Sequence, residues 1–163
     1  MDGMRQHATA LADAIEVAVP AWVERCVESR LRPATGEDPD WALRARTQAR
    51  AAGLQAQKDV GARVRELLES DIDDQATTPL AVLREAVSYP TEVLRQAGVP
   101  EVRRDEHQVR LLPDDAYDLA PASFSDVDPS LAEVGIAWGA AKAYEHIRRH
   151  GGGRRAEHEE GER

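Results

Sequence analysis

Apolar side chains recur along the first part of the chain at alternating steps of four and three, the spacing that places them on one face of an α-helix. The positions with this spacing are Met4, Ala8, Leu11, Ile15, Val19, Trp22 and Cys26. Pro20 interrupts the pattern, because proline has no N–H to donate to the carbonyl of Glu16 and its ring crowds the preceding turn. We predict a buried helix that is kinked or divided at Pro20 and ends near Leu31.

A second long helix is predicted over residues 39–70. Asp38 is placed to cap it, and Pro39 suits its first turn. The inward positions are small in the first half and larger in the second: Ala45, Ala49, Ala52, Ala56, Val60, Val64, Leu67 and Leu68. Because alanine adds so little side chain, the first half can lie close against a partner helix.

Shorter helices follow this long one. Thr78 and Pro79 form a new helix start, with threonine as the cap and proline at the first helical position. Pro90 ends or kinks that segment, and a further short helix reaches Ala97 before Gly98.

A proline-rich stretch, residues 99–128, separates these helices from the last one. Its prolines alternate with the apolar residues Leu111, Leu112, Tyr117, Leu119 and Phe124. That many apolar residues predict an ordered loop over the core rather than a disordered linker. Asp128 and Pro129 begin a final helix, and residues 151–163 form a charged, glycine-rich tail that we expect to be disordered.

The composition agrees with an all-α fold. The chain has 163 residues, 4% of them aromatic, which is enough for one domain with one core. We therefore predict a single-domain helical bundle over residues 1–150, with a long central helix and almost no sheet. The net charge of -9 opposes binding to nucleic acid or anionic membranes. No apolar run approaches a membrane span, and Cys26 is alone, so we expect a cytoplasmic protein.

The final helix carries two glycines four residues apart. Gly135 and Gly139, continued by Ala143, form a smooth strip beside Trp138 that would let another backbone come close. We predict that this strip packs within the chain against the alanines of the long helix. The alternative is a seam between two copies of the chain.

The same helix ends in two histidines, His146 and His150, whose i, i+4 spacing can present two imidazoles to one metal ion. Two ligands make half a site, and neighbouring arginines would repel a cation. We therefore favour a role for these basic side chains at the negative end of the helix dipole, and expect no cofactor. A metal-dependent enzyme built on the two histidines is the least favoured hypothesis.

Residues 91–110 invite comparison with a helix-turn-helix, because a tight turn at Gly98 would separate two helices. The side chains that would face DNA are Arg103, Arg104, Gln108 and Arg110. Leu94 stands where the first helix needs a small residue, and Arg104 stands where the second helix should bury an apolar one. A DNA-binding regulator with a degenerate motif is therefore the second hypothesis.

Signatures of catalysis are missing from the sequence. It contains no phosphate-binding glycine loop, no G-x-S-x-G elbow and no paired cysteines. Cys26 lies on the apolar stripe and is interpreted as a core residue. Acidic pairs such as Asp114 with Asp115, and Asp126 with Asp128, lie in turns or before helices, where carboxylates cap free N–H groups.

Residues 89–150, with YPTEVLRQAGVP, YDLAP and GIAWGAAKA, resemble small uncharacterised helical proteins of actinobacteria. The excess of arginine over lysine suits such a GC-rich source. The resemblance implies no activity and no functional residue. From the residues themselves, the favoured function is a non-catalytic adaptor or regulatory protein that acts through a protein partner.

Overall fold

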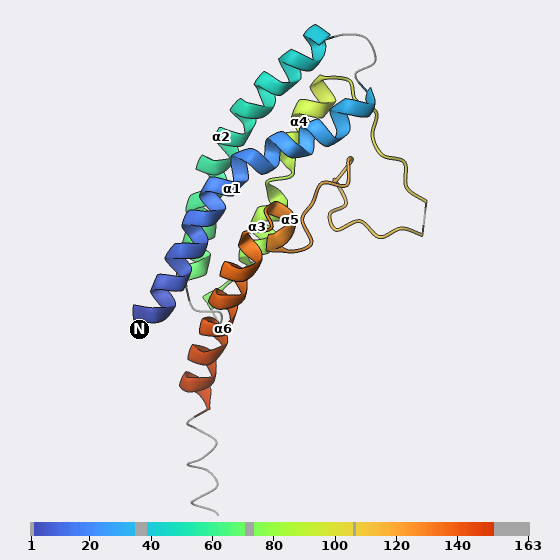
Figure 1. Ribbon diagram of the computed structural model, residues 1–163. Helices are drawn as coiled ribbons and strands as arrows, with labels where there is room; N and C mark the ends of the chain where they lie inside the picture. The colour runs from blue at the N-terminus through green and yellow to red at the C-terminus, as the bar shows by residue number, and fades with distance from the viewer. Residues whose placement is uncertain (1, 35–38, 71–73, 106, 152–163) are drawn as a thin grey trace, which may run out of the picture.

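The computed structural model describes residues 2–34, 39–70, 74–105 and 107–151 (Figure 1). The described residues are helical or irregular and contain no strand, which confirms the all-α prediction. The helices are α1 (Asp2–Ala34), α2 (Pro39–Glu69), α3 (Pro79–Glu85), α4 (Ser88–Gln96), α5 (Phe124–Val127) and α6 (Leu131–His150). The predicted cap Asp38 and residues 152–163 of the predicted tail lie outside the described residues.

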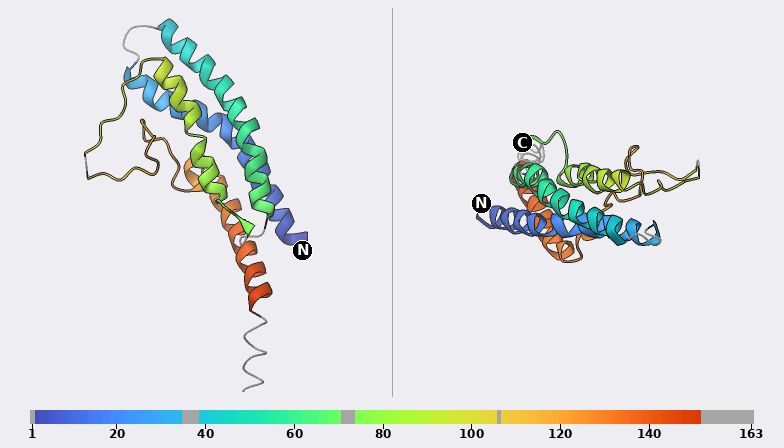
Figure 2. Two further views of the ribbon diagram at one scale, coloured as in Figure 1. Left: turned by 180° about the vertical axis from the view of Figure 1, so that it is seen from behind. Right: turned by 90° about the horizontal axis from the view of Figure 1, so that it is seen from above.

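Two long antiparallel helices, α1 and α2, form the body of the molecule, as the views in Figures 1 and 2 show. The helix α4 packs against both of them, and α3 packs against α2. The final helix α6 runs antiparallel to α1 and contacts it, with the single turn α5 at its start. None of the described helices has the length and apolarity needed to cross a membrane.

The apolar stripe of α1 is buried, with Met4 partly so. Pro20 does not divide the helix, which continues past the predicted end at Leu31 to Ala34 and changes direction along its length (Figure 1). Pro20 has no N–H, so the carbonyl of Glu16 has no helical backbone donor. It accepts a hydrogen bond of 2.7 Å from the side-chain amide of Gln57 in α2 instead. A side chain of α2 thus supplies the hydrogen-bond donor that Pro20 lacks.

Gln57→Leu is expected to lower the free energy of unfolding by about 1 to 2 kcal/mol, because it leaves this partly buried carbonyl without its donor. The measurement is urea-induced unfolding followed by circular dichroism. Gln48→Leu, at an exposed position of the same helix, is the matched control and should change stability by less than about 0.5 kcal/mol. Equal losses in the two variants would contradict the role given to Gln57.

Backbones of α1 and α2 come into direct contact at Gly53. A Cβ atom built on Gly53 would lie 2.8 Å from the Pro20 carbonyl oxygen and 2.9 Å from the Pro20 Cα. The alanine stripe of α2 is buried on either side of this point, and its first half packs against Val27 and Leu31 of α1. The close partner of the stripe is therefore α1, and the prediction that the final helix packs there is wrong.

Carbonyl groups in the last turn of α2 and just after it position α6. Helix geometry leaves the last carbonyl groups of any helix without donors. The indole N–H of Trp138 donates to the carbonyl of Leu68 at 3.1 Å, and the buried ammonium group of Lys142 donates to the carbonyl of Ser70. A cation at the negative end of the α2 dipole is also favoured electrostatically.

The short helices begin close to the predicted places. The Thr78 hydroxyl accepts from the N–H of Ala81 at 3.1 Å, which confirms the cap, and Pro79 is the first residue of α3. Pro90 was predicted to end or kink a helix, but it lies in the first turn of α4, where its missing N–H has no helical partner to lose. Gly98 adopts a φ of 75°, and Val99 N–H donates back to Leu94, which closes α4.

Asp115 organises the second half of the proline-rich loop. Its buried carboxylate accepts hydrogen bonds from the backbone N–H groups of Tyr117 (3.3 Å), Leu119 (3.1 Å) and Ala120 (2.8 Å). The buried Tyr117 donates its hydroxyl to the carbonyl of Val99 at 2.7 Å. The first half of the loop extends away from the helices (Figure 1), and Leu111, predicted to anchor it, is 51% exposed.

Candidate functional site

The two glycines of α6 have different surroundings. A Cβ atom on Gly135 would lie 3.1 Å from Cδ2 of Phe124, whose ring meets Trp138 edge to face with 6.4 Å between centroids. A Cβ atom on Gly139 would meet no atom within 4 Å, and Ala143 is exposed. Gly135 and Trp138 therefore take part in packing, whereas the predicted packing of Gly139 and Ala143 within the chain is wrong, because they lie on the side of α6 away from α1.

Large apolar side chains gather on that side. Ile136 is 74% exposed, Tyr144 68% and Ile147 66%. Small residues lie between them at Gly139, Ala140 and Ala143. These six residues are called the outer face of α6. The other large exposed apolar residues of the described chain, namely Val17, Leu43, Leu54, Val109 and Leu111, are divided among α1, α2 and the loop, so the outer face of α6 is the main exposed apolar surface on one element.

The histidine pair lies at the end of this helix. The rings of His146 and His150 have centroids 4.5 Å apart and planes inclined at 49°. Within the described residues, no group of three or more histidine, cysteine, aspartate or glutamate side chains could hold a metal ion. The structure thus brings the two imidazoles together and places no third ligand of the described chain beside them.

The second helix of the predicted helix-turn-helix does not form. The described residues between α4 and α5 contain no helix, so the turn at Gly98 leads into the proline-rich loop. A helix there would need an apolar side to bury, and Arg104 and His107 occupy the inward positions. The motif predicted for residues 91–110 is therefore wrong as a structure.

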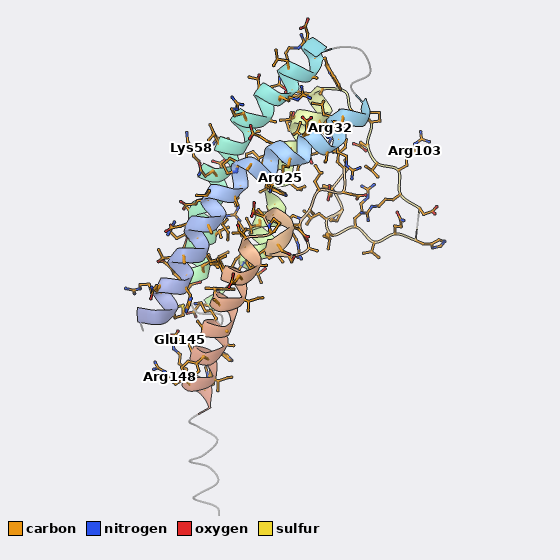
Figure 3. All side chains as sticks on the ribbon, viewed as in Figure 1. Arg25, Arg32, Lys58, Arg103, Glu145 and Arg148 are labelled. Carbon is orange, nitrogen blue, oxygen red and sulfur yellow. The ribbon has the colours of Figure 1, made fainter. Side chains whose placement is uncertain are left out.

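Two of the four side chains proposed to contact DNA make hydrogen bonds within the loop itself. Arg104 forms an ion pair with Asp118 and donates to the carbonyl of Val109 at 2.7 Å. Arg110 donates to the carbonyl of Val102 at 3.4 Å. Arg103 points away from the helices (Figure 3), and Gln108 is exposed. Arg104 and Arg110 thus stabilise the loop to which they belong.

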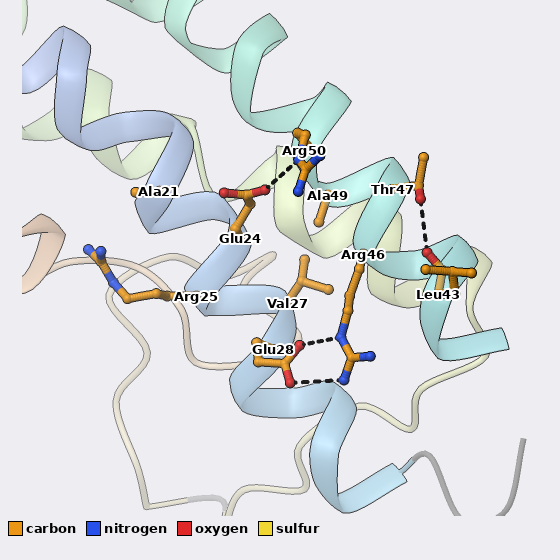
Figure 4. A pocket seen from close by; sticks show the side chains of 10 residues that line it. All are labelled: Ala21, Glu24, Arg25, Val27, Glu28, Leu43, Arg46, Thr47, Ala49 and Arg50. Carbon is orange, nitrogen blue, oxygen red and sulfur yellow. Dashed lines mark hydrogen bonds and ion pairs between the residues drawn. The ribbon is translucent and has the colours of Figure 1, made fainter. Parts of the chain in front are cut away.

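A groove of about 540 Å³ runs between α1 and the first half of α2 (Figure 4). Its lining residues are Ala21, Glu24, Arg25, Val27, Glu28, Leu43, Arg46, Thr47, Ala49 and Arg50. Arg46 meets the carboxylate of Glu28 with both Nε (2.9 Å) and Nη2 (3.1 Å), and Arg50 lies 3.4 Å from Glu24. Opposite charges are therefore paired across the groove.

The electrostatics at Glu28 do not suit a general base. Hydrogen bonds from Arg46 are the main cause that lowers the pKa of Glu28, and Arg32 adds to the effect. A general base for chemistry near neutral pH needs a carboxylate pKa raised towards 7, the opposite direction. The hydroxyl of Thr47 donates to the Leu43 carbonyl of its own helix at 3.0 Å. The ion pairs of Arg46 with Glu28 and of Arg50 with Glu24 join the two helices.

Cys26 faces the core next to the groove. Its side chain is buried, and burial is the main cause that raises the pKa of its thiol to about 12. A nucleophilic cysteine needs a thiolate, so this side chain does not have the character of a catalytic group. Its interpretation as a core residue is confirmed.

Sequence reasoning did not find the groove, although a signal was present. Glu24 and Glu28 are four residues apart in α1, and Arg46 and Arg50 are four apart in α2, so two ion pairs form when the helices lie antiparallel.

The groove has its charges paired within the chain, whereas the apolar outer face of α6 is exposed. The chain matches no protein-family model, no curated protein and no solved structure, so both surfaces are interpreted from their own residues.

Proposed function

We propose that this protein is a non-catalytic adaptor or regulatory protein that binds a protein partner through the outer face of α6. The observation that carries the proposal is the exposure of Ile136, Tyr144 and Ile147 on one helix. Each large apolar side chain left in water forgoes roughly 1.5 to 3 kcal/mol of burial free energy, which a partner surface can recover. The small residues between them would let a partner helix approach closely.

The charge of the chain supports a protein partner over other macromolecules. The net charge of -9 repels nucleic acid and anionic membranes at long range. The ion pairs of the α1–α2 groove satisfy its arginines within the chain, which leaves less reason for that surface to bind an anion. A cytoplasmic location is part of the proposal and agrees with the single, buried cysteine.

The proposal is tested by photo-crosslinking in host cells. Benzoylphenylalanine in place of Tyr144 is expected to form covalent adducts with protein, which mass spectrometry of the excised adduct identifies. The matched control carries the same group in place of Leu54, an exposed apolar residue of α2. Adducts from both positions in equal yield, or from neither, would contradict the proposal.

A further inference from the structure

Four exposed residues of the outer face of α6 give the same pattern of residue types and spacings in either direction along the helix. Ile136, Ala140, Ala143 and Ile147 are separated by steps of four, three and four, with isoleucine at both ends and alanine at both inner positions. With 3.6 residues per turn, these four residues lie in one row along the helix. A row with this symmetry is complementary to an antiparallel copy of itself.

We propose that a second copy of this chain covers the outer face of α6, with the two helices antiparallel about a two-fold axis between residues 141 and 142. In such an interface residue i of one copy meets residue j of the other, and j meets i. Ile136 then lies opposite Ile147 of the second copy, and Ala140 lies opposite Ala143. The inference rests on the proposed function in one respect, which is that both assign binding to the outer face of α6.

Charges beside the row favour the antiparallel orientation. Glu133 lies one turn before Ile136, Arg148 follows Ile147, and both side chains are exposed. An antiparallel pair places Glu133 of each copy beside the turn that carries Arg148 of the other. A parallel pair would place glutamate beside glutamate and arginine beside arginine, which is repulsive.

Within the described residues, no other segment of the chain covers this face. The described helices leave it exposed, with α1 on the opposite side of α6. Residues 152–163 supply Ala156 and otherwise only glycine and charged or polar side chains. An apolar counterpart of matching length is present in the outer face of a second α6.

The contact surface is small, so the dimer should exchange with the monomer. Three large apolar side chains and the intervening alanines from each copy make an interface at the lower end of specific ones, which bury roughly 1,200 Å² in total. The central alanines allow the helix axes to approach to about 8 Å, so the isoleucines at the ends can meet. Association is therefore expected to depend on protein concentration.

Sedimentation velocity of the full chain, in about 0.15 M salt to screen the net charge of -9, tests the inference. The wild type is expected to shift from monomer to dimer as its concentration rises. Ile147→Glu should raise the dimer dissociation constant at least about 100-fold, because it places a carboxylate against Ile136 at both symmetric contacts. Leu54→Glu, the matched control on α2, should leave it unchanged. A wild type that stays monomeric at the highest concentration, or equal weakening by both variants, would overturn the inference.

Disulfide trapping tests the orientation. In the antiparallel pair, position 136 of one copy lies beside position 147 of the other, whereas identical positions are about 16 Å apart, beyond disulfide reach. A mixture of Ile136→Cys and Ile147→Cys proteins should form a crosslinked dimer on mild oxidation, and neither protein alone should do so. Cys26 is buried and does not compete. Crosslinking of each variant to itself but not to the other would show a parallel pair and overturn the proposal.

Failure of the dimer and failure of the proposed function give different results. If the purified chain stays monomeric while Tyr144 crosslinks to a different protein in cells, the second-copy inference is wrong and the proposed function holds. If the purified chain dimerises through Ile147 and Tyr144 crosslinks to the chain itself, the second-copy inference is supported. If Tyr144 yields no adduct in cells and the chain is monomeric, both are wrong.

Discussion

Gly53→Ala is expected to destabilise the protein by about 1 to 3 kcal/mol, although alanine is intrinsically favoured over glycine by about 1 kcal/mol inside a helix. The new Cβ atom would lie 2.8 Å from the carbonyl oxygen and 2.9 Å from the Cα of Pro20. These are backbone atoms in the middle of α1, so they cannot move aside as the end of a flexible side chain can. The helices must separate, and the packing beside the crossing point loosens. Denaturant unfolding followed by circular dichroism measures the loss.

Gly139→Ala is the matched control for Gly53→Ala. A Cβ atom at Gly139 meets no atom within 4 Å, so only the helix propensity changes. The free energy of unfolding should rise by up to about 1 kcal/mol when it is measured at a dilution that keeps the chain monomeric. A destabilised Gly139→Ala variant, or a Gly53→Ala variant as stable as the wild type, would contradict the assignment of the close helix contact to Gly53.

Asp115→Ala is expected to cost about 3 to 5 kcal/mol, because it removes a buried carboxylate and leaves three backbone N–H groups without their acceptor. Those groups belong to Tyr117, Leu119 and Ala120, which attach the proline-rich loop to the core. Asp115→Asn keeps one accepting oxygen and should lose less. The free energy of unfolding and the hydrogen exchange of the three amides measure the effect.

The neighbouring Asp114 provides the control for this prediction. It is exposed, and Asp114→Ala should change the free energy of unfolding by less than about 0.5 kcal/mol. If both alanine variants lost the same stability, the three hydrogen bonds to Asp115 would not be the reason. If neither variant lost stability, the loop would not depend on this carboxylate.

The sequence alone was enough to predict the long helices and their buried sides. Helical periodicity is a local property, so the burial of Ile15 or Val64 follows from spacing without knowledge of the partner. The helix start at Thr78 and Pro79 was predictable for the same reason, because a cap involves residues within one turn. The extent of α2 was predicted to within a residue.

Partners and register depended on the tertiary structure. Gly53 and Gly139 both lie inside helices, but the crossing of α1 and α2 leaves no room for a Cβ atom at Gly53, whereas a Cβ atom at Gly139 meets no atom within 4 Å. A kink or a division was predicted at Pro20; the helix is not divided, and the side chain of Gln57 donates to the Glu16 carbonyl, which has no backbone donor because of the proline. Neither contact can be derived from local spacing, since each joins residues far apart in the chain.

The candidate sites divide in the same way. The sequence determined that α6 has an apolar side and a smooth strip, because both follow from residue type and helical spacing. Only the tertiary structure decided which side faces α1, since the carbonyls of Leu68 in α2 and of Ser70, just after α2, accept hydrogen bonds from Trp138 and Lys142. That choice leaves Ile136 and Ile147 at the surface. A local pattern specifies the faces of a helix, and the hydrogen bonds and packing between distant helices decide which face is buried.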